Sequence, residues 1–136
     1  MSYEQAQANL EIAFDWLNAM RHRDIEKIGQ LVHPDLVWVD VAGNVACDGR
    51  ELALAWLRAT PNELSEVDAI ELLGNEEHVM LGVRNHARDE LAGLKLEDGQ
   101  SFTVFTLRDG QISRLRGHVH REEALADAGI EGYRWR

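Results

Sequence analysis

Apolar side chains recur every three or four positions in the first part of the chain, which is the spacing of one face of a helix. This repeat predicts a helix over about residues 4–21. Its members are Leu10, Ala13, Phe14 and Leu17. Asp24 can cap a second, shorter helix, and Pro34 prevents that helix from continuing. The chain is therefore expected to open with two helices that each bury an apolar face.

The next segment, residues 36–41, is almost wholly apolar and rich in β-branched side chains. Such a run is typical of a strand that is buried on both faces. After a glycine turn and a short extended piece, Asp48 and Glu51 have the spacing of a capping box. They predict a third helix that reaches about Ala59 and is closed by Pro61.

The second half of the chain changes to the period of strands. The four β-rich segments cover residues 67–73, 79–88, 101–108 and 112–120. Turns that contain Gly-Asn or Asp-Gly separate them, and Asp-Gly between β-rich segments is a strong hairpin signal. A final short helix is expected from Glu122 to Ala128, with Gly129 just past its end.

Alternation along the second of these strands predicts which side chains face the core. The odd positions are mostly apolar and are expected to point inward, and they include Val79, Leu81, Val83 and Asn85. The even positions are expected to point outward, and they include Arg84, His86 and Arg88. An inward Asn85 needs a hydrogen-bond partner, and a buried asparagine most often has a structural role.

Helices followed by strands indicate an α+β fold in which helices pack on one face of a curved antiparallel sheet. At 136 residues, the chain is expected to form one domain over residues 1–136. The outward face of the third strand carries Phe102, Val104 and Thr106, which is too apolar at its centre for open solvent. We therefore predict a homodimer that forms through this outer sheet face.

Charge and composition narrow the classes of partner. The net charge of −10 argues against nucleic acid or an anionic membrane as a partner, because both attract basic surfaces. Cys47 is the only cysteine, so no internal disulfide can form. The acidic start of the chain lacks the features of a signal peptide, and no apolar run is long enough to span a bilayer. A cytoplasmic protein is the simplest expectation.

One carboxylate stands out because Asp40 lies at the end of the apolar strand, just before the glycine turn. It is either a solvated residue of the strand end or a general base in a pocket, where burial would disfavour its ionised form. An Asp40 held by arginine or by backbone donors would favour a binding or structural role, whereas an unpaired one would favour catalysis.

Three histidines of the predicted strands are candidates for a zinc site. His118 and His120 lie two apart on one predicted strand face, and His86 lies on the same outer face. The strand over 101–108 separates His86 from the other two by about two strand spacings of roughly 4.8 Å each. We therefore expect these histidines to make interface or solvent hydrogen bonds, and we expect no metal.

The order of elements resembles the SnoaL-like branch of the nuclear-transport-factor-2-like superfamily. The resemblance covers nearly the whole chain and is carried by the segments Val39-Asp40-Val41-Ala42-Gly43, Gly49-Arg50, Arg108-Asp109-Gly110-Gln111-Ile112 and Arg121-Glu122-Glu123-Ala124-Leu125. It implies a cone-shaped sheet wrapped around the N-terminal helices with one pocket at the open end. It also implies frequent dimerisation through the outer sheet face. Members include ketosteroid isomerases, polyketide cyclases, epoxide hydrolases and pure binding domains.

The resemblance also assigns roles to residues. Asp40 stands where ketosteroid isomerases and related cyclases keep their catalytic aspartate. Trp16 stands near the oxyanion-binding tyrosine of the isomerases and Thr103 near their protonated aspartate, so the acid pair that those enzymes use is not reproduced. The arginine between two aspartates of epoxide hydrolases is not apparent, and His120 stands where many SnoaL-like sequences have an aspartate.

These observations predict a pocket for a small apolar ligand, with no cofactor. The candidate lining is Trp16, Met20, Trp38, Trp56, Asn85, Thr103 and Val119. If the protein is an enzyme, Asp40 acts as the base of an isomerase, cyclase or lyase and removes a proton next to a carbonyl group. Asn85, Thr103 or Trp16 would then donate to the carbonyl oxygen as negative charge develops on it. The alternative is a non-catalytic ligand-binding or dimerisation module.

Overall fold

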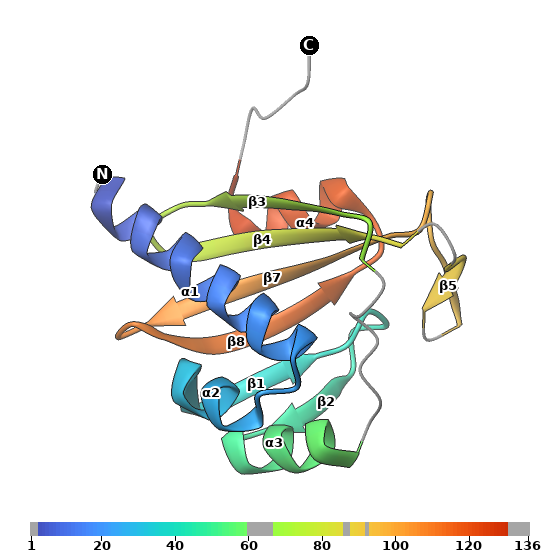
Figure 1. Cartoon of the computed structure of the whole chain (residues 1–136). Helices are drawn as coiled ribbons and strands as arrows, with labels where there is room; N and C mark the ends of the chain where they lie inside the picture. Colours follow the sequence, from blue (N-terminus) through green and yellow to red (C-terminus); the bar gives the residue numbers. More distant parts are fainter. Residues whose placement is uncertain (1–2, 60–66, 86–87, 92, 131–136) are drawn as a thin grey trace.

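The computed structural model of the chain describes residues 3–59, 67–85, 88–91 and 93–130. Three helices lie on the inner face of a curved sheet: α1 (Tyr3–Arg21), α2 (Ile25–Leu31) and α3 (Arg50–Ala59) (Figure 1). A fourth helix, α4 (Arg121–Ala128), lies on the outer face. The α+β class is confirmed, and Pro61 lies outside the described residues.

The main sheet has six strands in the order β2-β1-β8-β7-β4-β3. Their bounds are β1 (Val32–Val39), β2 (Val45–Asp48), β3 (Ala69–Gly74), β4 (His78–Arg84), β7 (Gln100–Arg108) and β8 (Gln111–His118). All neighbours are antiparallel except β1 and β8, which run parallel. The sheet is therefore mixed, whereas the sequence predicted an antiparallel one. Periodicity along a strand shows which faces are buried but not which strand lies beside it.

The short second helix begins as expected, because the Asp24 side chain accepts a hydrogen bond of 3.1 Å from the Lys27 backbone N–H. It ends differently, because β1 already begins at Val32 and contains Pro34. Pairing of β1 with β8 is irregular between Val32 and Val37, and this accommodates a residue that has no backbone N–H to donate.

The second strand of the meander is shorter than the predicted segment 79–88. β4 ends at Arg84, and a small hairpin of β5 (Glu90–Leu91) and β6 (Leu94–Lys95), which the sequence did not predict, follows. The return to β7 uses Asp98 and Gly99 with φ of 54° and 70°. A Cβ on Gly99 would lie 2.0 Å from the Asn85 carbonyl oxygen, so the strand end closes onto a residue that must be glycine.

The inner face of the sheet and the first three helices enclose the larger core. Its fully buried members include Leu17, Ile28, Leu36, Phe105 and Leu115. The predicted alternation of β4 is confirmed for Val79, Leu81 and Val83, which pack in or against this core.

α4 covers the apolar centre of the outer face. Met80, Phe102 and Val104 are buried there against Ala124 and Ala128. This placement corrects the expectation that all helices lie on one face of the sheet. It also accounts for the apolar side chains from which a homodimer was predicted, and the homodimer itself stays a prediction.

Two asparagines join the layers at one end of the sheet. Asn9 of α1 is fully buried and its Nδ2 donates to the carbonyl oxygens of Asn75 and Glu76, at 3.0 and 2.9 Å. Asn75 in turn donates from Nδ2 to the Ala128 carbonyl at 2.8 Å. These bonds tie α1 on the inner face and α4 on the outer face to the β3–β4 turn. Among the described residues, no helix has the length and apolarity needed to cross a membrane.

Candidate functional site

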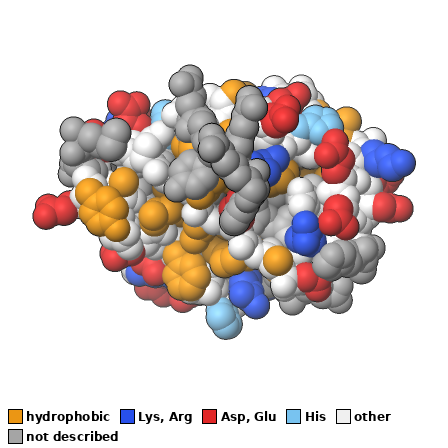
Figure 2. Space-filling view, turned by 90° about the horizontal axis from the view of Figure 1, so that it is seen from above, with side chains coloured by type: hydrophobic (Ala, Val, Ile, Leu, Met, Phe, Trp, Pro, Cys, Tyr) orange, Lys and Arg blue, Asp and Glu red, His pale blue; other side chains and the backbone are white. Residues whose placement is uncertain are grey.

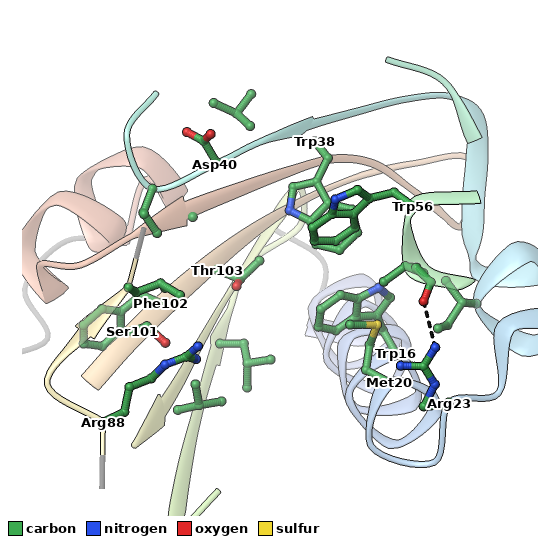
Figure 3. Close-up of a pocket in the computed structure, with 18 of the residues that line it drawn as sticks. Trp16, Met20, Arg23, Trp38, Asp40, Trp56, Arg88, Ser101, Phe102 and Thr103 are labelled. Atoms are coloured by element: carbon green, nitrogen blue, oxygen red, sulfur yellow. Dashed lines mark hydrogen bonds between the residues drawn. The ribbon is translucent and has the colours of Figure 1, made fainter. Parts of the chain in front are cut away.

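A cavity of about 360 Å³ lies between the inner sheet face and the three inner helices. Three tryptophans from three different elements form much of its wall: Trp16 of α1, Trp38 of β1 and Trp56 of α3 (Figure 3). Trp38 packs edge-on against Trp16 and Trp56, with ring centroids 6.1 and 5.3 Å apart. Edge-to-face packing of this kind holds the rings in fixed orientations and leaves flat apolar surfaces for a ligand.

The sequence places these rings by simple periodicity. Trp16 belongs to the buried stripe of α1 and is 4% exposed, whereas Trp56 is 45% exposed. Met20 lies one helical turn after Trp16 and also lines the cavity. The indole Nε1 of Trp16 is buried and has no acceptor among the described residues.

Asp40 lines the same cavity and is fixed by the turn that follows it. Its Oδ1 accepts hydrogen bonds from the backbone N–H groups of Ala42 and Asn44, at 3.0 and 2.9 Å. The other oxygen, Oδ2, has no hydrogen bond to any of the described residues. One carboxylate oxygen of Asp40 is thus fixed by the turn, and the residue forms part of the cavity lining.

Gly117 of β8 lets the turn approach the sheet. A Cβ on Gly117 would lie 2.9 Å from Cγ1 of Val41 and 3.2 Å from its backbone nitrogen. Because real Cβ atoms do not come so close to other atoms, only glycine allows the chain at Asp40 and Val41 to cross β8 here. Gly117 also lines the cavity.

A group of polar side chains, of which the sequence analysis placed only Thr103 in the pocket, lies on the side of the cavity away from the tryptophans. Ser101 and Thr103 point inward from β7, and Arg88 lines the cavity with them (Figure 3). The prediction placed Arg88 on the outer face, because it continued the alternation of β4 to residue 88. The strand ends at Arg84, and a turn in which the Arg88 N–H donates to the Asn85 carbonyl at 3.0 Å redirects the chain.

Two of the expected lining residues lie elsewhere. Asn85 follows the end of β4 and its backbone N–H donates to Gly99 at 3.0 Å. Val119 is buried just before α4. Neither is among the described residues that line the cavity, whereas Trp16, Met20, Trp38, Trp56, Thr103 and Asp40 all are.

Two of the three candidate histidines lie against carboxylate groups. His118 Nε2 lies 2.9 Å from Asp127 Oδ2, and His120 Nδ1 lies 3.2 Å from Glu97 Oε1. Burial alone would raise the pKa of Asp127, but the hydrogen bond from His118 and the charge of Arg114 together lower it. His86 lies outside the described residues, within which no cluster of three metal-ligating side chains occurs.

Comparisons with known proteins agree on one family and one fold. The family model of the SnoaL-like domain matches residues 13–115. No curated protein matches the sequence at a significant level.

Solved structures give the same fold at low identity. A protein from Jannaschia sp. CCS1, provisionally a SnoaL-like polyketide cyclase, has 16% identity and a TM-score of 0.66, with 97% of this chain and 98% of that chain covered. A protein from Kribbella flavida DSM 17836, provisionally a ketosteroid isomerase, has 16% identity and a TM-score of 0.65, with coverages of 96% and 84%. An LEH-like epoxide hydrolase of M. tuberculosis has 17% identity and a TM-score of 0.60, with coverages of 92% and 94%.

Proposed function

The chain belongs to the SnoaL-like domain family, and we propose that it binds a small, flat, largely apolar molecule in the cavity beneath its sheet. The observation that carries this proposal is the wall of three tryptophans around a space of about 360 Å³. That volume lies within the range of small-molecule sites in proteins. Apolar cavities lined by aromatic rings gain binding energy from the area that a ligand removes from water.

A cavity-filling variant tests this proposal. Thr103→Phe places a ring in the cavity from β7, and Thr106→Phe places the same ring on the opposite face of the same strand. Calorimetric titration with a neutral bicyclic probe, 2-naphthylmethanol, should show binding to the wild type and to Thr106→Phe but not to Thr103→Phe. Equal binding by all three proteins would place the site elsewhere. Native mass spectrometry of the purified protein then identifies any ligand that remains bound.

A second candidate function is proton transfer by Asp40, and the place of this residue in the cavity lining favours it. In this reaction Asp40 takes a proton from the carbon next to a carbonyl group, and the bond electrons move onto the carbonyl oxygen as an enolate. Return of the proton to a different carbon would isomerise the molecule. Among the similar structures, those provisionally assigned as isomerase and cyclase have the same fold.

The backbone hydrogen bonds to Oδ1 favour the non-catalytic alternative, because they give Asp40 a structural role in its own turn. The substitution Asp40→Asn distinguishes the catalytic function from the non-catalytic one. The amide oxygen can still accept hydrogen bonds from the backbone N–H groups of Ala42 and Asn44, so the turn is kept while the carboxylate is lost. The readout is exchange of the α-protons of 2-tetralone in heavy water, followed by NMR. A base should lose at least about a hundredfold of its acceleration in Asp40→Asn. Unchanged exchange, or no acceleration by the wild type, would leave binding as the function.

A further inference from the structure

We infer that the ligand of the cavity carries a carboxylate group, which Arg88 binds together with the hydroxyl groups of Ser101 and Thr103. This inference rests on the proposed small-molecule site and specifies the chemistry of its occupant. It changes the expectation of a purely apolar ligand into that of an apolar ring system with one anionic end.

The first argument is the position of Arg88. The Arg88 backbone N–H donates to the Asn85 carbonyl beyond the end of β4, and Arg88 lines the cavity from outside the strand. Figure 3 shows its side chain extending toward Ser101 and Thr103, with the tryptophans on the other side of the cavity. Ser101 and Thr103 occupy alternate positions of β7, and both line the cavity. One guanidinium and two hydroxyl groups therefore converge at one end of an apolar space.

The second argument is the charge of the lining. The whole chain carries a net charge of −10, but within the described part of the chain the charged residues that line the cavity are two arginines, Arg23 and Arg88, and one aspartate, Asp40. An excess of basic groups in the cavity of an acidic protein is the reverse of what its composition predicts. Such a local field favours an anionic ligand group over a cationic one.

The third argument is that Arg88, unlike Arg23, lies on the side of the cavity that carries Ser101 and Thr103 (Figure 3). Arg23 lies on the side of Trp16 and Met20, and its Nη2 donates to the carbonyl oxygen of Leu57 at 3.0 Å. Arg88 also interacts with other groups of the protein, and its five N–H donors allow it to keep such a contact while donating to a ligand. A guanidinium matches the two oxygens of a carboxylate with two parallel hydrogen bonds.

The position of Asp40 is compatible with an anion at Arg88. Figure 3 shows Asp40 and Arg88 at opposite edges of the polar half of the cavity. The negative charge of Asp40 is also compensated by the two backbone N–H groups that its Oδ1 accepts. A ligand can thus place its carboxylate at Arg88, its ring against the tryptophans and its reactive carbon toward Asp40.

The test compares two probes of the same ring system. The carboxylate probe is 2-naphthoate and the neutral probe is 2-naphthylmethanol, each titrated calorimetrically into the full chain. We expect the wild type to bind 2-naphthoate at least about tenfold more tightly, which is the scale of a charge-assisted hydrogen-bonded pair. Arg88→Gln should remove this preference while keeping the affinity for the neutral probe. Arg108→Gln, at the far end of β7 and outside the cavity lining, removes the same charge and should keep the preference.

The outcomes separate this inference from the proposed function. Binding of both probes with equal affinity by the wild type would overturn the carboxylate inference and leave the apolar site in place. A preference for 2-naphthoate that survives in Arg88→Gln would also overturn it, because another group would then be responsible. Binding of neither probe would contradict the proposed function and the inference together.

Discussion

At the scale of single residues, the position of Asp40 depends more on the turn that follows it and on Gly117 than on its own strand. The two backbone N–H groups of its own turn fix Oδ1, and the missing side chain of Gly117 lets that turn lie against β8. An apolar strand without these contacts would leave the position of the Asp40 carboxylate less fixed. The geometry of the candidate site therefore depends on a glycine that carries no chemistry.

We predict that Gly117→Ala displaces the Asp40 turn and lowers stability. Its new Cβ would lie 2.9 Å from Val41 Cγ1, so the turn must move or strain must be stored. Overpacking of this kind costs about 1–3 kcal/mol. Denaturant unfolding measures the loss, and the Asp40 and Ala42 amide resonances report the movement. Gly110→Ala is the control for loss of a glycine, because a Cβ there has no atom within 4 Å and only its φ of 76° opposes it. Unchanged amide resonances in Gly117→Ala would contradict the prediction.

Cys47 gives a second prediction at this scale. The side chain lies in β2, is 4% exposed, and burial raises the pKa of its thiol. Because the thiolate is the reactive form, native Cys47 should react with a thiol reagent at neutral pH at least about tenfold more slowly than the unfolded chain. Timed alkylation followed by mass spectrometry, with and without denaturant, measures both rates. Equal rates would mean that β2 opens readily from the edge of the sheet.

The candidate site residues that line the cavity are those whose positions regular periodicity controls. Trp16 and Met20 share a helix face, and Thr103 alternates inward on a strand, so spacing alone places them at the cavity. Asn85 and Arg88 were placed wrongly for one shared reason. Both depend on where β4 ends, and that end depends on the contact between Gly99 and the Asn85 carbonyl, which no local pattern reveals.

At the scale of elements, α4 is held to the outer face by both apolar and ionic contacts. Asp127 of α4 accepts from His118 at 2.9 Å and pairs with Arg114 at 3.3 Å, both on β8. At its other end, Arg121 donates two hydrogen bonds to Glu71 of β3, at 3.0 and 2.9 Å, and this contact raises the pKa of Arg121. The helix thus spans from β3 to β8 across the face of the sheet.

The pKa of Asp127 leads to a prediction about acid stability. A carboxyl group with a lowered pKa stabilises the fold above its unfolded pKa, about 3.9, and loses this contribution as the pH falls through the folded value. Asp127→Asn should therefore destabilise the protein by about 1–3 kcal/mol near neutral pH and by progressively less in acid. Thermal unfolding across this range measures the difference between the two proteins. Asp15→Asn, an exposed change on α1, controls for removal of a carboxylate, and a difference that stays constant with pH would contradict the prediction.

The sequence predicted the helices and strands well, but it predicted less well which of them lie side by side. Helix and strand periods, the Asp24 cap and the Asp109-Gly110 hairpin gave most boundaries to within a few residues. The parallel pairing of β1 with β8 and the docking of α4 on the outer face were not predicted, since both join segments far apart in the chain. The sequence analysis interpreted the apolar residues that α4 covers as a subunit interface. Side chains that contact a second subunit and side chains that are buried under a later helix give the same apolar pattern on the outward face of a strand.

At the scale of the whole molecule, the two sides of the sheet leave different kinds of side chain uncovered. Figure 2 shows hydrophobic side chains exposed where α1 and β3 lie, among charged side chains of both signs. Phe14 of α1 and Ile70 of β3 are 45% and 42% exposed. On the outer face, Thr106, Arg114 and Arg116 remain half-buried beside the part that α4 covers.

We predict a homodimer through this outer face, with α4 forming part of the interface. A symmetric arrangement can place the acidic first turn of one α4, with Glu122 and Glu123, near Arg116 of the second copy. A stable dimer of this kind needs about 800 Å² from each partner, which the uncovered strands and the outer side of α4 would have to supply together. Thr106→Asp adds a carboxylate to this face and should weaken the dimer, whereas Phe14→Ser alters the α1 surface and should leave it intact. Sedimentation velocity at micromolar concentration measures all three proteins, and a stable wild-type monomer would show that α4 alone completes the outer face.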